Sequence, residues 1–290
     1  MIRTIVVISG KGGTGKTSVT ASFAVLACDT LLADCDVDAA NMHLVLQPEM
    51  LKKIPFTGSE VAEIDTGLCN SCGACAEACA YDVISPDPYV VDPMACEGCA
   101  VCPLVCPCEA ISMRPEESGH WFVSETRAGK MVHARLHTGH ENSGKLVTQV
   151  REVAAELARE EGLDQILVDG PPGIGCSLIS AVTGADLAVV VTEPTVSGRH
   201  DLNRVLDLAE HFRLPVAVII NKWDLSETAS DELTAGCRER GVQVVGRLPY
   251  AEEFVLAQRQ GRSVVEKEGP EADALREIWN RIQEILISGK

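Results

Sequence analysis

Aromatic and basic residues are the two classes that this sequence has little of. Aromatic residues make up 4% of the 290 residues, although hydrophobic residues as a whole make up 46%. A core built mainly from Val, Ile, Leu and Ala is typical of buried parallel strands. The 25 basic side chains are outnumbered by 42 acidic ones, which gives a formal net charge of −17. Because this charge repels phosphate backbones and anionic lipid, we expect neither nucleic acid nor a membrane among the partners.

Long hydrophobic runs are also lacking. No stretch approaches the roughly 20 apolar residues that a membrane-spanning helix needs. The apolar segment at residues 1–8 is too short for a secretory signal. We therefore expect a cytoplasmic protein. In that reducing compartment, the 13 cysteines favour metal ligation over disulfides.

Short apolar runs alternate with helical stretches along most of the chain. The alternation predicts βαβ crossovers, and hence an α/β fold with a mostly parallel sheet. The predicted strands are Thr4–Ile8, Thr30–Ala33, Gln165–Val168, Leu187–Val191 and Val216–Ile220, and the predicted helices include Lys16–Ala27, Lys145–Glu161 and Asp201–His211. A C-terminal helix has one apolar face and several acidic residues, which favours core packing over membrane binding.

The pattern changes between about Gly58 and Pro115. Cys, Ala, Gly, Pro and acidic residues dominate there, and apolar periodicity disappears. So long a stretch without core strands is unusual inside a compact domain. The sequence therefore predicts a small inserted domain at 58–115, within a discontinuous domain at 1–57 and 116–290.

A glycine-rich loop separates the first predicted strand from the first helix. Its sequence from residue 10 to residue 17 is Gly-Lys-Gly-Gly-Thr-Gly-Lys-Thr. Glycines let backbone N–H groups converge on phosphate oxygens, and the helix N-terminus adds positive potential. We expect Lys16 to neutralise nucleotide phosphates and the Thr17 hydroxyl to ligate Mg²⁺. The residues expected to bind ATP here are Gly12, Gly13, Thr14, Gly15, Lys16, Thr17 and Ser18. The alternative, a chance glycine-rich turn, does not account for the strand–loop–helix context.

The extra lysine, Lys11, gives the loop a resemblance to the deviant Walker A motif of the MinD, ParA, Mrp and nitrogenase iron protein group. The resemblance implies a P-loop ATPase that dimerises on binding ATP, with Lys11 reaching the partner's nucleotide. It also implies slow hydrolysis that a partner stimulates.

Two further segments resemble the switches of that group. Residues 33–41 resemble switch I, which implies that Asp36 orients the attacking water and that Asp34 lies near Mg²⁺. Residues 168–173 resemble switch II, which implies that Asp169 holds a Mg²⁺-bound water. Carboxylates at the carboxyl ends of parallel strands face the crevice where nucleotides bind, so the physical argument agrees. Asn221 and Pro249 resemble positions that recognise adenine.

Eight cysteines form two runs with the same spacing, Cys-x2-Cys-x2-Cys-x3-Cys. The runs are Cys69, Cys72, Cys75, Cys79 and Cys96, Cys99, Cys102, Cys106, with Pro107 after the second. They resemble a two-cluster bacterial ferredoxin, a small α+β domain in which the fourth cysteine of each run ligates the other cluster. The resemblance implies two [4Fe–4S] clusters, one on Cys69, Cys72, Cys75 and Cys106, the other on Cys96, Cys99, Cys102 and Cys79. Ala80 departs from the usual proline after the first run.

Zinc is the main alternative for these cysteines, but zinc sites need only two Cys-x2-Cys pairs and no third cysteine at this spacing. The clusters could serve electron relay or be purely structural. The other cysteines are interpreted as small buried hydrophobic residues, and they are Cys28, Cys35, Cys108, Cys176 and Cys237. Cys176 follows Asp169 by seven residues, as a bridging cluster ligand does in nitrogenase-type iron proteins. No second cysteine stands near residues 142–144, so a third, bridging cluster is not expected.

Residues 132–146 hold three histidines, His133, His137 and His140. They suggest a metal site, although a solvated hairpin is an equally good interpretation because their spacing is irregular. This segment resembles part of the MinD-like ATPases that contain a ferredoxin domain.

Three functions fit this sequence. The main hypothesis is an ATPase that gates electron transfer to a redox partner through its ferredoxin domain. The second is an iron–sulfur cluster carrier that serves an acceptor protein, although the C-terminal Cys-x-x-Cys of such carriers is lacking. The third is a positioning ATPase with structural clusters. The insert follows switch I and precedes switch II, so both of its connections lead to segments expected to respond to the γ-phosphate.

Overall fold

The computed structural model describes residues 2–137 and 143–288. The chain forms two compact units. The first comprises Met1–Lys53, Trp121–Arg135 and Ser143–Lys290, and the second comprises Ile54–His120 and Leu136–Asn142. The predicted insert, 58–115, falls inside the second unit. That it is an independent domain stays a prediction.

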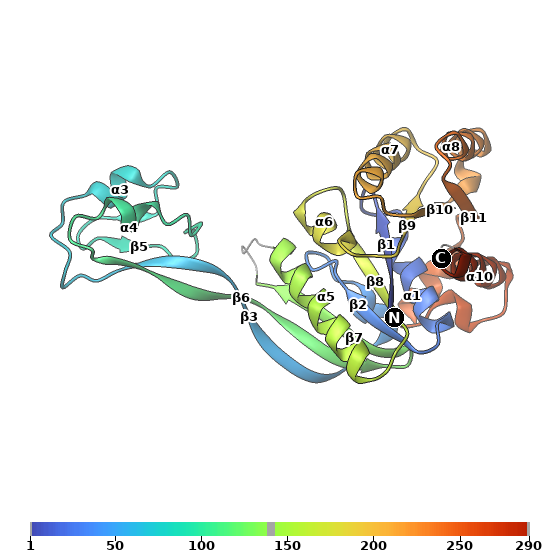
Figure 1. Cartoon of the computed structure of the whole chain (residues 1–290), viewed down its shortest axis with the longest axis horizontal. Coiled ribbons are helices and arrows are strands. Elements are labelled where there is room, and N and C mark those ends of the chain that lie inside the picture. The colour runs from blue at the N-terminus through green and yellow to red at the C-terminus, as the bar shows by residue number, and fades with distance from the viewer. Residues whose placement is uncertain (1, 138–142, 289–290) are drawn as a thin grey trace. The chain divides into compact units, whose positions relative to one another are not determined.

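One large sheet organises the chain (Figure 1). Its nine strands have the order β11-β10-β9-β1-β8-β2-β7-β6-β3. The bounds are β1 Arg3–Ser9, β2 Thr30–Asp34, β3 Glu49–Ile64, β6 Ile111–Thr126, β7 Gly129–Leu136, β8 Gln165–Pro172, β9 Leu187–Thr192, β10 Val216–Asn221 and β11 Gln243–Leu248. All five strands predicted from the sequence are present, each extended by one to four residues.

The central strand pairs are parallel. β1 lies between β8 and β9, with Ile5 opposite Leu167 on one side and Leu187 on the other. β2 pairs in parallel with β8 and β7, and β10 with β9 and β11. Parallel neighbours bring their carboxyl ends to one edge, which places the functional loops together. The fold is the predicted α/β P-loop NTPase fold with a mostly parallel sheet.

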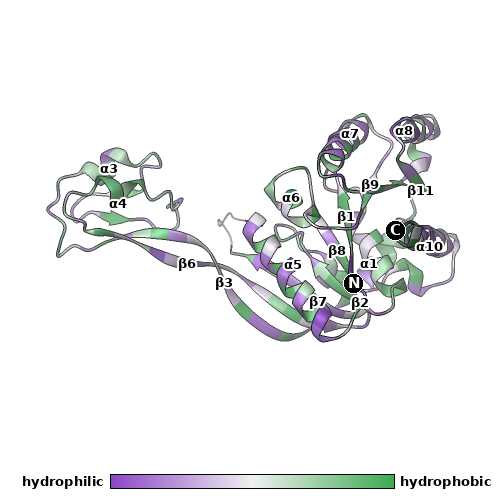
Figure 2. Cartoon of the chain, in the orientation of Figure 1, coloured by the Kyte–Doolittle hydropathy of each residue, from purple (hydrophilic) through white to green (hydrophobic). Residues whose placement is uncertain are grey.

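Helices cover both faces of this sheet in the first unit (Figure 1). α1 (Lys16–Leu26) packs against α10 (Pro270–Ser288), and α5 (Ser143–Glu160) packs against α6 (Cys176–Val182) and β2. The remaining helices of this unit are α2 Met42–Leu46, α7 Val196–His211, α8 Glu227–Glu239 and α9 Glu252–Arg259. Figure 2 shows hydrophobic central strands and helices with many hydrophilic residues. The pattern is typical of amphipathic helices packed on a buried sheet.

The C-terminal helix confirms the predicted core packing. Leu275, Ile278, Trp279 and Ile282 of α10 are buried, and the Trp279 ring lies 5.0 Å from the Phe23 ring between centroids. Within the described residues, no helix combines the length and the apolar character that crossing a bilayer requires.

Strands β3 and β6 were not predicted. Each has 16 residues, and β3 is mostly exposed, contains Pro55 and Gly58, and lacks regular alternation. Strand prediction depends on alternating apolar residues, and these strands provide little of that signal. β7 was not predicted either, and its last five residues, 132–136, lie in the segment 132–146 that was interpreted as a possible solvated hairpin.

The second unit contains two short helices and a small two-stranded sheet. They are α3 (Ala74–Ala78), α4 (Val101–Val105), β4 (Ile84–Ser85) and β5 (Val90–Val91). Its buried apolar cluster consists of Ala62, Cys75, Ile84 and Ile111, with several further cysteines packed against it. So small a core contributes little stability by itself.

Candidate functional site

The glycine-rich loop lies between β1 and α1, as predicted. Gly13 and Gly15 have positive φ values of 79° and 89°, which other residues adopt only with strain. A Cβ on Gly15 would come within 2.3 Å of the Asn221 amide nitrogen. Gly12 and Gly13 are exposed, and a Cβ on either would meet nothing within 4 Å. The loop backbone therefore lies open to a ligand on one side and is held by Asn221 on the other.

Lys16 and Asp169 form the centre of a buried polar cluster at the start of α1. The Lys16 Nζ lies 2.9 Å from Asp169 Oδ1 and 3.3 Å from Asp36 Oδ2. The hydroxyls of Thr17 and Thr20 donate to the two Asp169 oxygens at 2.9 and 2.8 Å. Both Asp36 and Lys16 are buried. The structure thus brings together the predicted lysine, the predicted Mg²⁺ ligand Thr17 and one aspartate from each predicted switch.

The electrostatics of this cluster favour a cation. Burial and repulsion from Asp169 raise the pKa of Asp34 to about 8, although Lys16 opposes them. Burial likewise raises the pKa of Asp36 against the attraction of Lys16. Burial alone would lower the pKa of Lys16, but attraction to Asp169 and Asp36 outweighs it and raises the pKa. A divalent cation near these carboxyl groups would favour their ionised forms. The chemistry of the donors therefore fits Mg²⁺.

Thr14 adds a second indication that the loop suits a ligand. Its side chain is buried, yet Oγ1 has no hydrogen-bond partner within the part of the chain that the structure describes. A buried hydroxyl without a partner is costly. A phosphate oxygen in the loop would accept its hydrogen bond. Ser18, the last predicted residue of the loop, is partly exposed one residue beyond Thr17.

Lys11 does not join the Lys16 cluster. Its Nζ lies 2.6 Å from Glu193 Oε1 and donates to the Ser197 hydroxyl at 2.9 Å. Glu193 follows β9, and Ser197 belongs to the first turn of α7, whose N-cap Thr195 accepts a hydrogen bond from the Gly198 N–H. Within one chain, Lys11 therefore contacts its own β9–α7 connection. The predicted role on a partner's nucleotide stays a prediction.

Glu193 also binds a second lysine that the sequence analysis missed. Lys222 Nζ lies 3.1 Å from Glu193 Oε2 and donates to the Gly13 carbonyl at 2.9 Å. Burial acts to raise the pKa of Glu193, but hydrogen bonds from Lys11 and Lys222 outweigh it and hold the pKa below its usual range. The ionised Glu193 thus ties the loop to β9. Glu193 lies at the carboxyl end of a predicted strand, and this position could have identified it in the sequence. The same position did identify Asp34 and Asp169.

The two predicted adenine positions differ in their surroundings. The Asn221 side-chain amide donates to the Thr14 carbonyl at 2.7 Å, so Asn221 holds the phosphate loop. Pro249 follows β11, and the next residue, Tyr250, is exposed while its N–H donates to Asp224 at 2.7 Å. Contact of either residue with adenine stays a prediction.

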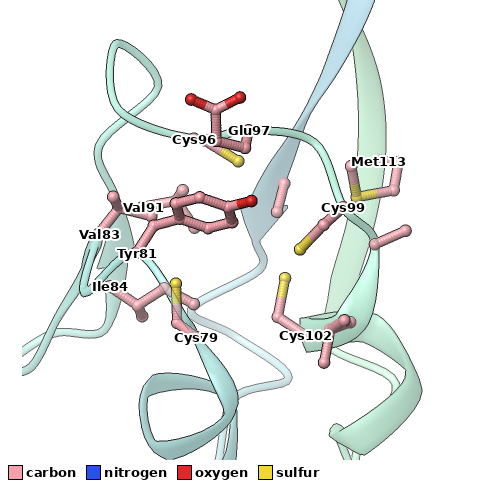
Figure 3. Close-up of a pocket in the computed structure, with 13 residues that line it drawn as sticks. Cys79, Tyr81, Val83, Ile84, Val91, Cys96, Glu97, Cys99, Cys102 and Met113 are labelled. Carbon is pink, nitrogen blue, oxygen red and sulfur yellow. The ribbon is translucent and has the colours of Figure 1, made fainter.

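The eight regularly spaced cysteines line two separate pockets in the second unit. Cys69, Cys72, Cys75 and Cys106 line one of them, with Tyr89. The other is lined by Cys79, Cys96, Cys99 and Cys102, with Tyr81. Figure 3 shows the second pocket, where the side chains of Cys99 and Cys102 point toward each other. Each pocket takes three cysteines from one run and the fourth from the other run. This grouping is the one that the resemblance to two-cluster ferredoxins implies.

Backbone geometry repeats between the two cysteine runs at an offset of 27 residues. Left-handed residues precede the second cysteine of each run, Ser71 with φ 59° and Gly98 with φ 65°. Left-handed residues also follow it, Gly73 and Ala100, and each caps a five-residue helix. Cys79 and Cys106 end these helices with ψ values of 111° and 110°. Each run therefore wraps its pocket with the same turn.

Thiol chemistry in these pockets favours a bound cation over free thiolates. Burial, with the nearby Cys96 and Cys99, raises the pKa of Cys102 to about 11. Burial also raises the pKa of Cys75, next to Cys69 and Cys106. A buried thiol whose pKa is raised in this way stays protonated at neutral pH unless a metal takes the proton's place.

The other cysteines lie apart from both pockets. Cys35 and Cys237 are buried, as expected of small hydrophobic residues, whereas Cys28 and Cys176 are exposed and Cys108 is half-buried. Burial raises the pKa of the Cys35 thiol, which makes it unreactive. The position near residues 142–144, where a bridging cluster would need a partner cysteine, lies partly outside the described residues.

The chain is similar to nucleotide-binding proteins of one family. The sequence profile of the CobQ/CobB/MinD/ParA nucleotide binding domain matches residues 5–264. An uncharacterized protein of Methanocaldococcus jannaschii is 35% identical over 226 residues, which are 77% of this chain and 79% of that protein. A putative septum site-determining protein MinD of Mesostigma viride is 26% identical over 271 residues, which are 91% of this chain and 76% of that protein.

Solved structures show the same fold at low identity. The septum site-determining protein MinD from Pyrococcus horikoshii, complexed with Mg-ADP, has a TM-score of 0.58 and 19% identity, covering 98% of this chain and 97% of that chain. The MinC:MinD cell division protein complex of Aquifex aeolicus has a TM-score of 0.60 and 20% identity, covering 97% and 96%. These comparisons support the P-loop ATPase part of the prediction. They give no support to the iron–sulfur part, nor to a relation with the nitrogenase iron protein.

Proposed function

Because the chain belongs to the CobQ/CobB/MinD/ParA family of nucleotide-binding domains, we propose that it is an ATP-driven switch whose second unit holds two iron–sulfur clusters. The chain is a P-loop ATPase that binds ATP or ADP with Mg²⁺. The proposal adds that the ATP-driven switch acts together with the iron–sulfur clusters of the second unit. The observation that carries it is the pair of pockets, each lined by four cysteines drawn from both runs.

The residues present fit two [4Fe–4S] clusters. Cys69, Cys72, Cys75 and Cys106 would hold one, and Cys79, Cys96, Cys99 and Cys102 the other. Four thiolates per cluster and the exchange of the fourth cysteine between runs meet the requirement for such clusters. A bound cluster supplies one-electron redox chemistry. The Ala110 N–H donates to the Cys106 sulfur at 3.3 Å, a contact of the kind that tunes a cluster's reduction potential.

The switch itself is proposed from the nucleotide site. Lys16, Thr17 and the loop N–H groups bind the phosphates and Mg²⁺, and Asp36 orients a water for attack on the γ-phosphate. Asp36 follows β2, and Asp169 belongs to β8. A γ-phosphate beside Lys16 would therefore reposition the ends of both strands. Lys11 would leave Glu193 and bind the nucleotide of a second copy, closing a homodimer. ATP can change the state of the chain, and so act on a partner protein, only if it binds the closed state and the open state with different affinities.

Positioning is the second candidate, and the names of the relatives favour it over electron transfer. MinD proteins are named for septum-site determination, and one of them forms a complex with MinC. In this case the clusters would only stabilise the second unit, and the ATP-dependent partner would be a structural protein. The cysteine pockets are compatible with both candidates.

One anaerobic experiment separates the candidates. The full chain is reconstituted with iron and sulfide, and EPR spectra and reduction potentials are recorded with and without ATP·Mg²⁺. A nucleotide-dependent shift in the potentials, or in the rate of reduction of an added acceptor, supports gated electron transfer. Iron delivered to an apo-acceptor supports a carrier instead. Clusters that bind yet ignore nucleotide in both assays would leave positioning as the function, and absence of iron would refute the cluster proposal itself.

A further inference from the structure

Three side chains in the second unit converge outside the cysteine pockets. Glu117 and His120 belong to β6, and His137 follows the end of β7. His120 Nε2 lies 3.2 Å from Glu117 Oε1, and His137 Nε2 lies 3.3 Å from His120 Nδ1 and 3.8 Å from Glu117 Oε1. Taking one ligand atom from each residue, all three atoms lie within 4.8 Å of one another. It is the sole such group of three among residues 2–137 and 143–288.

The backbone holds the two histidines in place. The connection between β6 and β7 is only two residues long, and the Thr126 hydroxyl closes it by donating to the Gly129 carbonyl at 2.7 Å. The His137 N–H donates to the Ser118 carbonyl at 2.9 Å, which fixes His137 beside the part of β6 that carries His120. The two imidazole rings lie 5.2 Å apart between centroids. The grouping therefore follows from strand pairing and does not depend on long flexible side chains alone.

The donor set and spacing suit zinc. Zn²⁺ takes imidazole nitrogen and carboxylate oxygen at about 2.0–2.2 Å in a tetrahedral arrangement, so its ligand atoms lie about 3.3–3.5 Å apart. The 3.2 Å contact involves His120 Nε2 and the 3.3 Å contact involves His120 Nδ1, so only one of these nitrogens serves an ion, and with one ligand atom from each residue the three atoms lie within 4.8 Å of one another. We propose that Glu117, His120 and His137 form a binding site for one zinc ion, with water at the fourth position.

His133, which the sequence suggested as a metal ligand, makes other contacts. His133 stacks on Phe122 with ring centroids 4.9 Å apart, and its Nε2 lies 2.9 Å from the Ser124 hydroxyl. Burial and the nearby His43 lower the pKa of His133 to about 4. His140 lies outside the described residues. The metal site thus contains His137, one of the three histidines noted in the sequence. Its second imidazole comes from His120, which no pattern of spacing in the sequence links to His137.

The site is open enough for an ion to enter. The His120 side chain is 19% exposed, and those of His137 and Glu117 are 42% and 48% exposed. The chain also carries a net charge of −17, which favours cation binding in general. A bound ion would link Ile54–His120 to the segment that starts at Leu136, the two parts of the second unit. The proposal does not depend on the iron–sulfur clusters or on their function.

Zinc titration of the full chain tests the site. Anaerobically purified protein with its clusters in place is dialysed against Zn²⁺ at pH 7.5, and zinc and iron are measured in the same sample. Unchanged iron shows that zinc has not replaced a cluster. The H120N/H137N variant is expected to bind one zinc ion fewer per chain than the wild type. The matched control is His200→Asn, since His200 also lies beside a carboxylate, 3.5 Å from Asp201, but in no group of three.

A second measurement needs no variant. Zinc is expected to protect His120 and His137 from diethyl pyrocarbonate by at least about fivefold, as mapped by mass spectrometry, while His200 reacts as before. Equal zinc content in the wild type and H120N/H137N, or equal modification with and without zinc, would overturn the proposal and leave a simple hydrogen-bonded cluster.

Discussion

The first and second units are stabilised by different means. In the first unit, aliphatic side chains of the sheet and of α1 and α10 form a large buried cluster around Phe23 and Trp279. In the second, the buried apolar cluster contains four residues, and one of them is itself a cysteine of the first run. Burial contributes roughly 25 cal/mol per Å² of apolar surface, so the second unit gains far less from it. A unit of this kind needs covalent or metal links.

The same contrast applies to their functional groups. In the first unit, Lys16, Asp36 and Asp169 are buried, and ion pairs join the Lys16 ammonium to both carboxylates. In the second unit, six of the eight pocket cysteines lie outside α3 and α4, near left-handed residues such as Gly73 and Gly98. We infer that the nucleotide site is preformed, whereas the cysteine pockets acquire their final geometry together with the metal.

Replacement of Lys16 should have the largest effect, and only on the first unit. Lys16→Ala removes the charge that would neutralise the phosphates, so ATP turnover should fall at least about 100-fold. Iron content should not change. Lys267→Ala, which changes an exposed lysine bonded to Gln260, is the control. Turnover within about threefold of wild type would contradict the assignment of the phosphate site.

Replacement of one pocket cysteine should affect only the second unit. Cys99→Ser removes an exposed ligand, and iron bound per chain should fall by about half, because the other pocket keeps its four thiolates. Basal ATP turnover should stay at the wild-type level. Cys108→Ser, two residues after Cys106 and outside both pockets, is the matched control. Full iron content in Cys99→Ser, or an equal loss in Cys108→Ser, would be incompatible with the proposed ligand set.

Acid should destabilise the first unit through His133. Its pKa is about 4 in the folded chain and 6.5 when unperturbed, so the unfolded chain binds more protons between these values. Stability therefore falls as pH decreases through this window, by about 1–2 kcal/mol between pH 7 and pH 5. Urea unfolding at both pH values would measure the loss. His133→Gln should reduce this difference, and an unchanged pH dependence would exclude His133 as its source.

Loss of the Glu193 carboxylate should have the smallest effect. Glu193→Gln weakens the ion pairs that hold Lys11 and Lys222, contacts worth about 1 kcal/mol each when partly exposed. Freed Lys11 should promote nucleotide-dependent dimerisation by several-fold, as measured by analytical ultracentrifugation with ATP·Mg²⁺. The control is Glu232→Gln, which changes an exposed pair with Arg199. Weaker dimerisation in Glu193→Gln would show that Glu193 supports the closed state instead.

Sequence reasoning was most successful where chemistry and spacing coincide. The strand–loop–helix at Lys16 and the five parallel strands were predicted because buried β-rich runs and glycine spacing are local signals. Glu193 and Lys222 were missed, since their roles depend on contacts between the phosphate loop and β9 and β10. The long strands β3 and β6 were missed because their sequences lack the regular alternation of apolar residues that identifies a strand.

The sequence by itself determined the ATPase family and the eight-cysteine spacing, because both reside in short runs whose geometry is local. Tertiary structure decided which cysteines share a pocket in the folded chain, where Lys11 binds within one chain, and that His120 contacts His137 while His133 stacks on Phe122. These outcomes depend on strand pairing and on the packing of segments far apart in the chain. No local pattern encodes them, since each results from contacts that exist only after folding.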